Sequence, residues 1–145
     1  MKNVAIALLL LVSVTACNNP SSKKTDNKEL ETTSVSAADT SIVNVYYFHG
    51  KARCKTCIAV GDVSKETIEK AFAGNSKVKF TEVNTADKTN DALVEKYEVT
   101  WNALIIAKGD QSEDLTEQAF ATAVENPEKL TENIKSVVNS MLETK

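Results

Sequence analysis

The chain has 145 residues, of which 17 are lysine or arginine and 20 are aspartate or glutamate, so its formal net charge is −3. This mildly acidic balance gives no support for nucleic-acid binding, and the length allows one domain with a core of its own. We expect the three cysteines to carry the chemistry of this protein. Cys17 follows an apolar N-terminal run, whereas Cys54 and Cys57 form a Cys-x-x-Cys pair.

Residues 1–16 have the pattern of an export signal. Lys2 precedes an uncharged run over 4–16, which is too short to span a bilayer comfortably and ends in small residues. The Val-Thr-Ala-Cys that ends at Cys17 resembles a bacterial lipobox, whose cysteine receives diacylglycerol and becomes the mature N-terminus. The alternatives are an ordinary signal with a coincidental cysteine and an uncleaved anchor. We expect a lipid-anchored protein on the extracytoplasmic (periplasmic) face of a bacterial membrane, and Asn18 favours the outer membrane over the inner.

The segment over 18–40 differs in composition from the residues after it. It consists mostly of Asn, Ser, Thr, Lys, Asp and Glu, and it contains no aromatic residue. Such a segment buries too little apolar surface to offset the entropy lost on ordering. We therefore predict a lipidated N-terminus and flexible polar tether over 17–40, followed by one folded domain over 41–145. The alternative is a partner-binding segment that folds on contact.

Strand-like and helical patterns alternate from residue 42 onward. A β-branched and aromatic run predicts a first strand that is buried on both faces. The stretch over 113–124 is ambiguous between an edge strand and a helical turn. Alternation of this kind indicates an α/β fold, in which helices cover a sheet. The predicted elements are a strand over 42–48, a helix from Cys57 to Gly74, a strand over 78–83, a short helix over 91–97 with Ala92, Leu93 and Tyr97 facing inward, a strand over 103–107, and a terminal helix capped by Asn126 with Pro127 at its first position.

Cys54 and Cys57 lie where the first strand gives way to a helix. A Cys-x-x-Cys pair at such a junction is the layout of a dithiol–disulfide redox site. The helix N-terminus favours a thiolate on Cys54, and nearby Lys51, Arg53 and Lys55 add positive charge. We predict that Cys54 is the exposed nucleophile and that Cys57 is the resolving thiol. The alternative for this pair is a static structural disulfide.

His49 is the single histidine of the chain. Three interpretations remain open for it: a solvent-facing residue at the strand end, a general base near Cys54, or a third ligand that joins Cys54 and Cys57 around a soft metal such as copper(I). The sequence contains no phosphate-binding glycine loop and no dinucleotide fingerprint. We therefore expect no cofactor.

The order of strand, Cys-x-x-Cys, helix, strand, helix, strand and terminal helix resembles the thioredoxin-like superfamily over 41–145. This resemblance implies a central mixed β-sheet flanked by helices. It also implies that Trp101 and Asn102 lie near the cysteines, where Trp101 could wall the substrate site; taken alone, a tryptophan such as Trp101 is more often a core residue. The resemblance is carried by 45–48 with the loop into Cys54, and by 83–84, Leu93, 96–99 and 104–106.

Three departures from the family pattern bear on mechanism. Asn102 stands where the family has a cis-proline, a residue that helps keep metals off the cysteines there. The loop before Cys54 is one residue longer than in typical thioredoxins, and Arg53 replaces a tryptophan. Tyr47 or Phe48 occupies the strand position of a buried aspartate, which in the family accepts a proton from the second cysteine.

Together these features predict a membrane-tethered thiol–disulfide oxidoreductase. We expect a monomer that acts on protein thiols and disulfides with an unidentified redox partner, and we favour reduction over oxidation. The alternative function is binding or delivery of copper(I) or another thiophilic metal by Cys54, Cys57 and His49. A redox-inert interaction module is the remaining alternative.

Overall fold

The computed structural model describes residues 40–144. The predicted export signal, the predicted lipidation site Cys17 and the predicted tether up to residue 39 lie outside these residues. Within the described range, no helix combines the length and the apolar character that crossing a bilayer requires.

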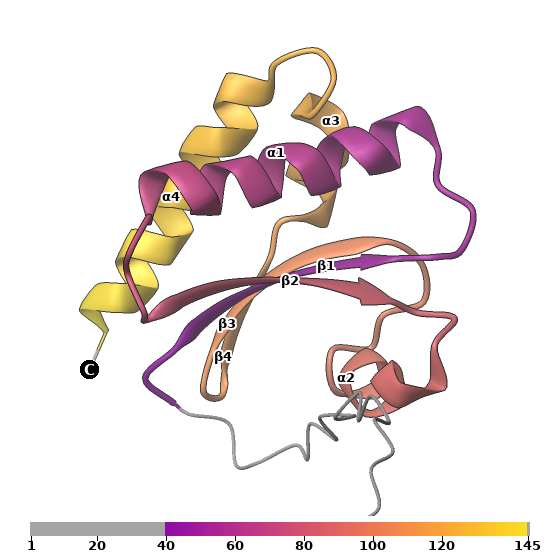
Figure 1. Ribbon diagram of the computed structural model, residues 1–145, viewed down its shortest axis with the longest axis horizontal. Helices are drawn as coiled ribbons and strands as arrows, with labels where there is room; N and C mark the ends of the chain where they lie inside the picture. Colours follow the sequence, from indigo (N-terminus) through magenta and orange to yellow (C-terminus); the bar gives the residue numbers. More distant parts are fainter. Residues whose placement is uncertain (1–39, 145) are drawn as a thin grey trace, which may run out of the picture. The chain divides into compact units, whose positions relative to one another are not determined.

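The strands of the described range form one mixed sheet in the order β2-β1-β3-β4 (Figure 1). The central β1 pairs in parallel with β2 and antiparallel with β3, which in turn pairs antiparallel with β4. One face of β1 is completely buried at Val43, Val45 and Tyr47, whereas the other face is buried at Phe48 and only partly buried at Asn44 and Tyr46, so the predicted burial on both faces holds in part. The strands are β1 (Val43–His49), β2 (Val78–Asn84), β3 (Ala103–Lys108) and β4 (Gln111–Asp114).

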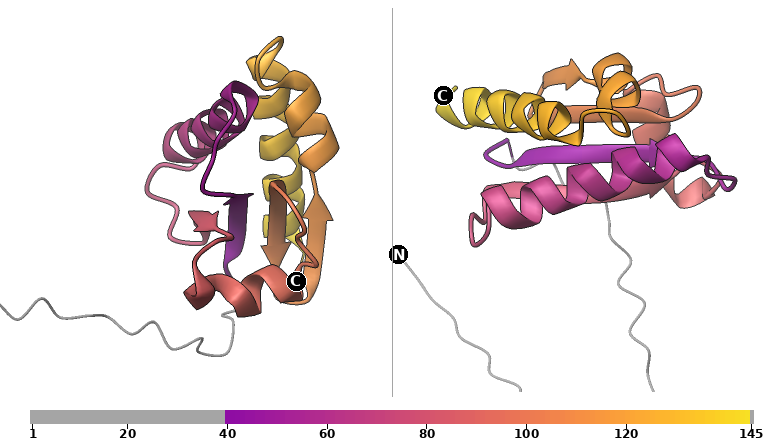
Figure 2. Two further views of the ribbon diagram at one scale, coloured as in Figure 1. Left: turned by 90° about the vertical axis from the view of Figure 1, so that its right-hand side faces the viewer. Right: turned by 90° about the horizontal axis from the view of Figure 1, so that it is seen from above.

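Helices cover both faces of this sheet (Figures 1 and 2). One face carries α1 (Lys55–Ala71), α3 (Thr116–Thr122) and α4 (Pro127–Glu143), and the other face carries the short α2 (Asp91–Lys96), which follows a 3₁₀ turn. The predicted α/β fold with a central mixed sheet flanked by helices is thereby confirmed.

Two apolar clusters hold these layers together. The larger one lies between the sheet and α1, α3 and α4, and it includes Tyr47 of β1 and Leu130 of α4. The smaller one lies beneath α2 and includes Phe48 and Val83. Complete burial of one such aliphatic or aromatic side chain stabilises a fold by roughly 1.5–3 kcal/mol. Neighbouring residues of β1 thus contribute to opposite cores, because successive side chains of a strand alternate between its faces.

The terminal helix α4 follows the predicted pattern. The side chain of Asn126 accepts a hydrogen bond from the backbone N–H of Lys129 at 3.1 Å, and Pro127 begins the helix. This cap satisfies a backbone donor that would otherwise lack a partner. The apolar face of α4 packs on the sheet through Leu130, Ile134, Val138 and Met141.

Other predicted boundaries need correction. The first helix begins at Lys55 rather than at Cys57, with Cys54 as its N-cap. The ambiguous stretch divides into the end of β4 and α3. Ala92 is exposed, and Val94 packs with Leu93 on the smaller cluster instead. The phase of a helix as short as α2 is set by the turn that precedes it, so periodicity alone could not identify its inner face.

Candidate functional site

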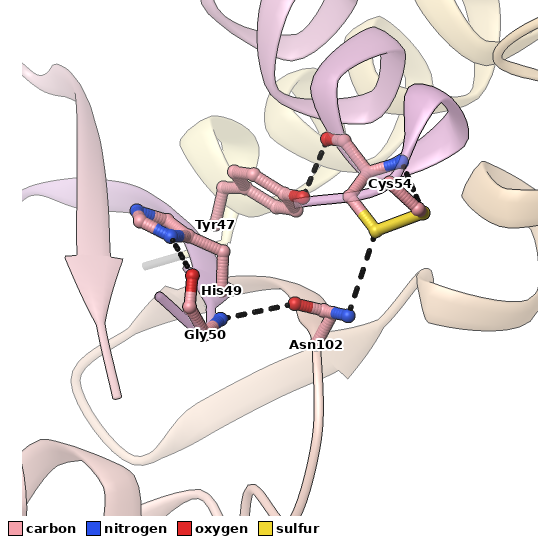
Figure 3. The surroundings of a disulfide bond; sticks show 6 residues. Tyr47, His49, Gly50, Cys54 and Asn102 are labelled. Carbon is pink, nitrogen blue, oxygen red and sulfur yellow. Dashed lines mark hydrogen bonds between the residues drawn. A yellow bond between two sulfur atoms is a disulfide. The ribbon is translucent and has the colours of Figure 1, made fainter. Parts of the chain in front are cut away.

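Cys54 and Cys57 are joined by a disulfide at the start of α1 (Figure 3). The Sγ atom of Cys54 accepts a hydrogen bond from the backbone N–H of Cys57 at 3.1 Å, so this sulfur caps the helix. Cys54 is exposed, whereas Cys57 is only 4 % exposed. The first turn of α1 contains no acidic residue, and Lys55 is exposed at its first position. The partial positive charge of the helix N-terminus therefore acts on the Cys54 sulfur without an opposing carboxylate in that turn.

Tyr47 lies beneath the first turn of α1. Its hydroxyl donates a hydrogen bond to the backbone carbonyl of Cys57 at 2.5 Å, and its side chain is fully buried. Burial raises the pKa of Tyr47, although the nearby Arg53 guanidinium opposes this effect. The hydroxyl consequently stays protonated and acts as a donor at neutral pH. Phe48 faces the opposite cluster, so Tyr47 is the residue that approaches the site, and it brings a donor where the family resemblance places a carboxylate.

Arg53 lies over the Tyr47 ring and pairs with Glu82 of β2. Its guanidinium carbon is 5.5 Å from the ring centroid, and its Nη1 is 2.7 Å from Oε1 of Glu82. Its Nε and Nη2 atoms are buried and have no hydrogen-bond partner among residues 40–144. Because Glu82 offsets the charge of Arg53, this side chain contributes less positive potential at Cys54 than the unpaired cation that the sequence suggested.

Gly61 of α1 leaves room for the Tyr47 ring and for the Arg53 guanidinium that lies over it. A Cβ atom built at Gly61 would lie 2.7 Å from Nη2 of Arg53 and 2.9 Å from Cε1 of Tyr47. Distances this short are below what van der Waals contact allows, so α1 can lie this close to β1 only because residue 61 has no side chain. The glycine therefore helps to place the helix that carries both cysteines.

His49 is enclosed rather than facing solvent, and that interpretation of it was wrong. Its side chain is 13 % exposed and stacks on Tyr47 with 5.8 Å between ring centroids. Its Nδ1 atom donates to the backbone carbonyl of Gly50 at 2.9 Å, and Nε2 is 3.5 Å from Oε1 of Glu82. Both ring nitrogens are thus directed at oxygen atoms. No group of three or more His, Cys, Asp or Glu side chains between residues 40 and 144 is arranged to hold a metal ion.

Asn102 connects the disulfide to the loop that precedes it (Figure 3). Its Oδ1 accepts a hydrogen bond from the backbone N–H of Gly50 at 3.2 Å, and its Nδ2 donates to Sγ of Cys57 at 3.7 Å. The antiparallel pairing of β1 with β3, which places Phe48 opposite Ala103, brings these segments together. Among the peptide bonds that the structure describes, none is cis.

Trp101 precedes Asn102 and is 78 % exposed. It is therefore not a core residue, although its neighbour contacts the disulfide. Ile58 follows Cys57 directly and is 44 % exposed. These are two of the three large hydrophobic side chains that are exposed in the described range, and both adjoin residues of the disulfide site in sequence.

Sequence reasoning missed Glu82 and the hydroxyl contact of Tyr47. Glu82 contacts both Arg53 and His49 because the parallel register places it directly beside Tyr47. A carboxylate within an otherwise strand-like run was the available signal. The register that brings it beside Tyr47 could not be obtained from one sequence.

No protein-family model matches this chain, and no curated protein matches it. Among the solved structures that match is one described as the structure of a malarial protein, with 19 % sequence identity and a TM-score of 0.38. The alignment covers 55 % of this chain and 93 % of that chain. A likeness this weak carries no argument about fold or function.

Proposed function

We propose that this chain is a thioredoxin-like thiol–disulfide oxidoreductase that exchanges disulfides with other proteins. The observation that carries the proposal is the asymmetry of one disulfide: Cys54 is exposed and caps a helix, while Cys57 is buried one turn further on. The order of strands and helices around this junction supports membership of the thioredoxin-like superfamily.

In the reducing direction, the Cys54 thiolate attacks one sulfur of a substrate disulfide. A mixed disulfide with Cys54 forms, and one substrate thiolate leaves and takes a proton from water. The Cys57 thiolate then attacks the Cys54 sulfur, which forms the Cys54–Cys57 disulfide and releases the second substrate thiolate. Two electrons pass from the protein dithiol to the substrate, and a redox partner that supplies two electrons restores the dithiol.

The surroundings of the cysteines favour a protein substrate. Trp101 and Ile58, which adjoin Asn102 and Cys57 in the sequence, expose large apolar side chains, and tryptophan is enriched at protein–protein interfaces relative to the rest of the surface. Copper(I) delivery has less support, because the ring nitrogens of His49 are directed at oxygen atoms of Gly50 and Glu82. Among residues 40–144, Cys54 and Cys57 have no third His, Cys, Asp or Glu side chain arranged with them to hold a metal ion.

Reduction of insulin by the metal-free protein tests this proposal. We expect the reaction to require both Cys54 and Cys57, and we expect His49→Ala to retain most of the rate because the imidazole is directed away from sulfur. Tight copper(I) binding that depends on His49, without measurable disulfide exchange, would instead establish metal delivery.

We further propose that the domain is held at the extracytoplasmic face of a bacterial membrane through lipid on Cys17, which follows the lipobox-like Val-Thr-Ala. Labelled palmitate should be incorporated into the wild-type protein and not into Cys17→Ser, because the acyl chains are attached to this residue. Equal labelling of the variant would refute the anchor and would leave the proposed redox chemistry unaffected.

A further inference from the structure

We propose that the side-chain amide of Asn102 stabilises Cys57 as a thiolate, and that it thereby makes Cys57 the sulfur that leaves when the Cys54–Cys57 disulfide is attacked. This inference rests on the proposed function and assigns a role to a side chain that contacts a reacting atom. Its basis is the position of Asn102 between Gly50 and Cys57 (Figure 3).

The orientation of the amide is fixed by its other contact. Gly50 offers a backbone N–H, which is a donor only, so the atom of Asn102 that faces it must be the oxygen. The NH₂ group then faces Sγ of Cys57, at 3.7 Å. A rotated amide would place its NH₂ group against the Gly50 N–H and its oxygen against sulfur, which would lose both hydrogen bonds. The backbone N–H of Gly50, directly after β1, thus orients the Asn102 amide so that its NH₂ group faces the buried sulfur.

Cys57 needs such a donor more than Cys54 does. The Cys54 sulfur is exposed to water and already accepts the N–H of residue 57 at the helix N-terminus. The Cys57 sulfur is almost completely buried, and burial opposes formation of an anion. The Tyr47 hydroxyl, which also approaches this residue, donates to its carbonyl rather than to its sulfur. Among residues 40–144, the side chain that donates a hydrogen bond to the Cys57 sulfur is therefore that of Asn102.

The contact becomes stronger as charge develops. A disulfide sulfur is a weak acceptor, whereas a thiolate accepts a charge-assisted hydrogen bond. When an incoming thiolate attacks Sγ of Cys54, a new disulfide to Cys54 forms, the Cys54–Cys57 bond breaks, and its electron pair stays on Cys57. The amide stabilises this leaving thiolate and, in the opposite direction, increases the fraction of Cys57 that is ready to attack a mixed disulfide.

The direct test uses a protein with one thiol. In the full chain with Cys17→Ser and Cys54→Ser, the ultraviolet absorbance of the Cys57 thiolate is titrated against pH. We expect Asn102→Ala to raise the titration midpoint by about one pH unit, a tenfold loss of thiolate below the midpoint, because a hydrogen bond to a charged group is removed. We expect Asn102→Asp to raise it further, because it directs a negative charge at the sulfur.

The aspartate variant separates this role from a structural one. One oxygen of Asn102→Asp can still accept the Gly50 N–H, so the loop keeps its anchor while the donor to sulfur is lost. Asn44→Ala is the matched control, because the Asn44 amide donates to a backbone carbonyl at the other end of β1 and should leave the midpoint unchanged. If both Asn102 variants titrate like this control, the inference is refuted.

The two-cysteine protein connects the inference to the proposed function. Attack of reduced glutathione on the Cys54–Cys57 disulfide should slow about tenfold in Asn102→Asp, because the leaving thiolate faces a carboxylate. An unchanged rate would contradict the leaving-group role. A wild-type protein that fails to reduce insulin would refute the proposed function alone, because the titration of Cys57 reports on Asn102 whether or not the protein exchanges disulfides with other proteins.

Discussion

Cys54→Ser is expected to abolish disulfide exchange, whereas Cys57→Ser is expected to leave a protein that captures its substrates as stable mixed disulfides. The exposed Cys54 sulfur is the one that a substrate can reach, and it lies at the helix N-terminus, which favours its thiolate. Without Cys57, the mixed disulfide on Cys54 has no internal thiol to release it. Non-reducing electrophoresis after incubation with a protein disulfide shows the adducts.

Alkylation of the reduced protein provides an independent measurement of this asymmetry. At near-neutral pH, iodoacetamide should modify Cys54 at least about tenfold faster than Cys57, since Cys57, in the first turn of α1, is buried. Peptide mapping by mass spectrometry distinguishes the two sites. Faster modification of Cys57, or adducts formed by Cys54→Ser, would reverse the assigned roles.

Gly61→Ala is expected to lower the free energy of unfolding by about 1–3 kcal/mol, a typical cost of overpacking a core. A loss of stability would be informative, because alanine is more favourable than glycine inside a helix by about 1 kcal/mol. Helix propensity alone would therefore make Gly61→Ala more stable than the wild type. The new methyl group would meet the Tyr47 ring, which is fully buried and held by its hydroxyl, as well as the guanidinium of Arg53. Urea denaturation of the oxidised protein measures the change.

Gly50→Ala is the matched control for this experiment. A Cβ atom at Gly50 would have no heavy atom within 4 Å among those outside its own neighbourhood in the chain, so the free energy of unfolding should change by less than about 0.5 kcal/mol. If Gly61→Ala proved as stable as wild type, Tyr47 and Arg53 would have to move aside at little energetic cost, and the tight packing of α1 on β1 would not depend on this glycine.

Much of the fold was predictable because local patterns determine it. The apolar run of β1 and the apolar spacing of α4 have one reasonable interpretation each, and Asn126 with Pro127 forms a cap that local geometry alone explains. The division of 113–124 into β4 and α3 was not predictable. It depends on pairing of the polar β4 with β3, a contact that no pattern within β4 itself encodes.

The candidate site was predictable to the extent that it is local in sequence. The spacing of Cys54 and Cys57 indicated a pair, and the structure joins them in a disulfide. The partners of Arg53, His49 and Cys57 are distant in sequence: Glu82 lies in β2, and Asn102 lies directly before β3. Such contacts depend on strand register, and a shift by one residue would turn Glu82 to the opposite face of the sheet.

The direction of β1 determines how the domain is presented to its surroundings. Thr40, the first residue that the structure describes, lies close to Gly109. Gly109 belongs to the turn between β3 and β4. The disulfide follows the far end of β1, a seven-residue strand that spans about 20 Å. The residues that precede Thr40 therefore join the domain at the end of β1 that is remote from Cys54, and the Cys54–Cys57 disulfide lies beyond the opposite end of the same strand.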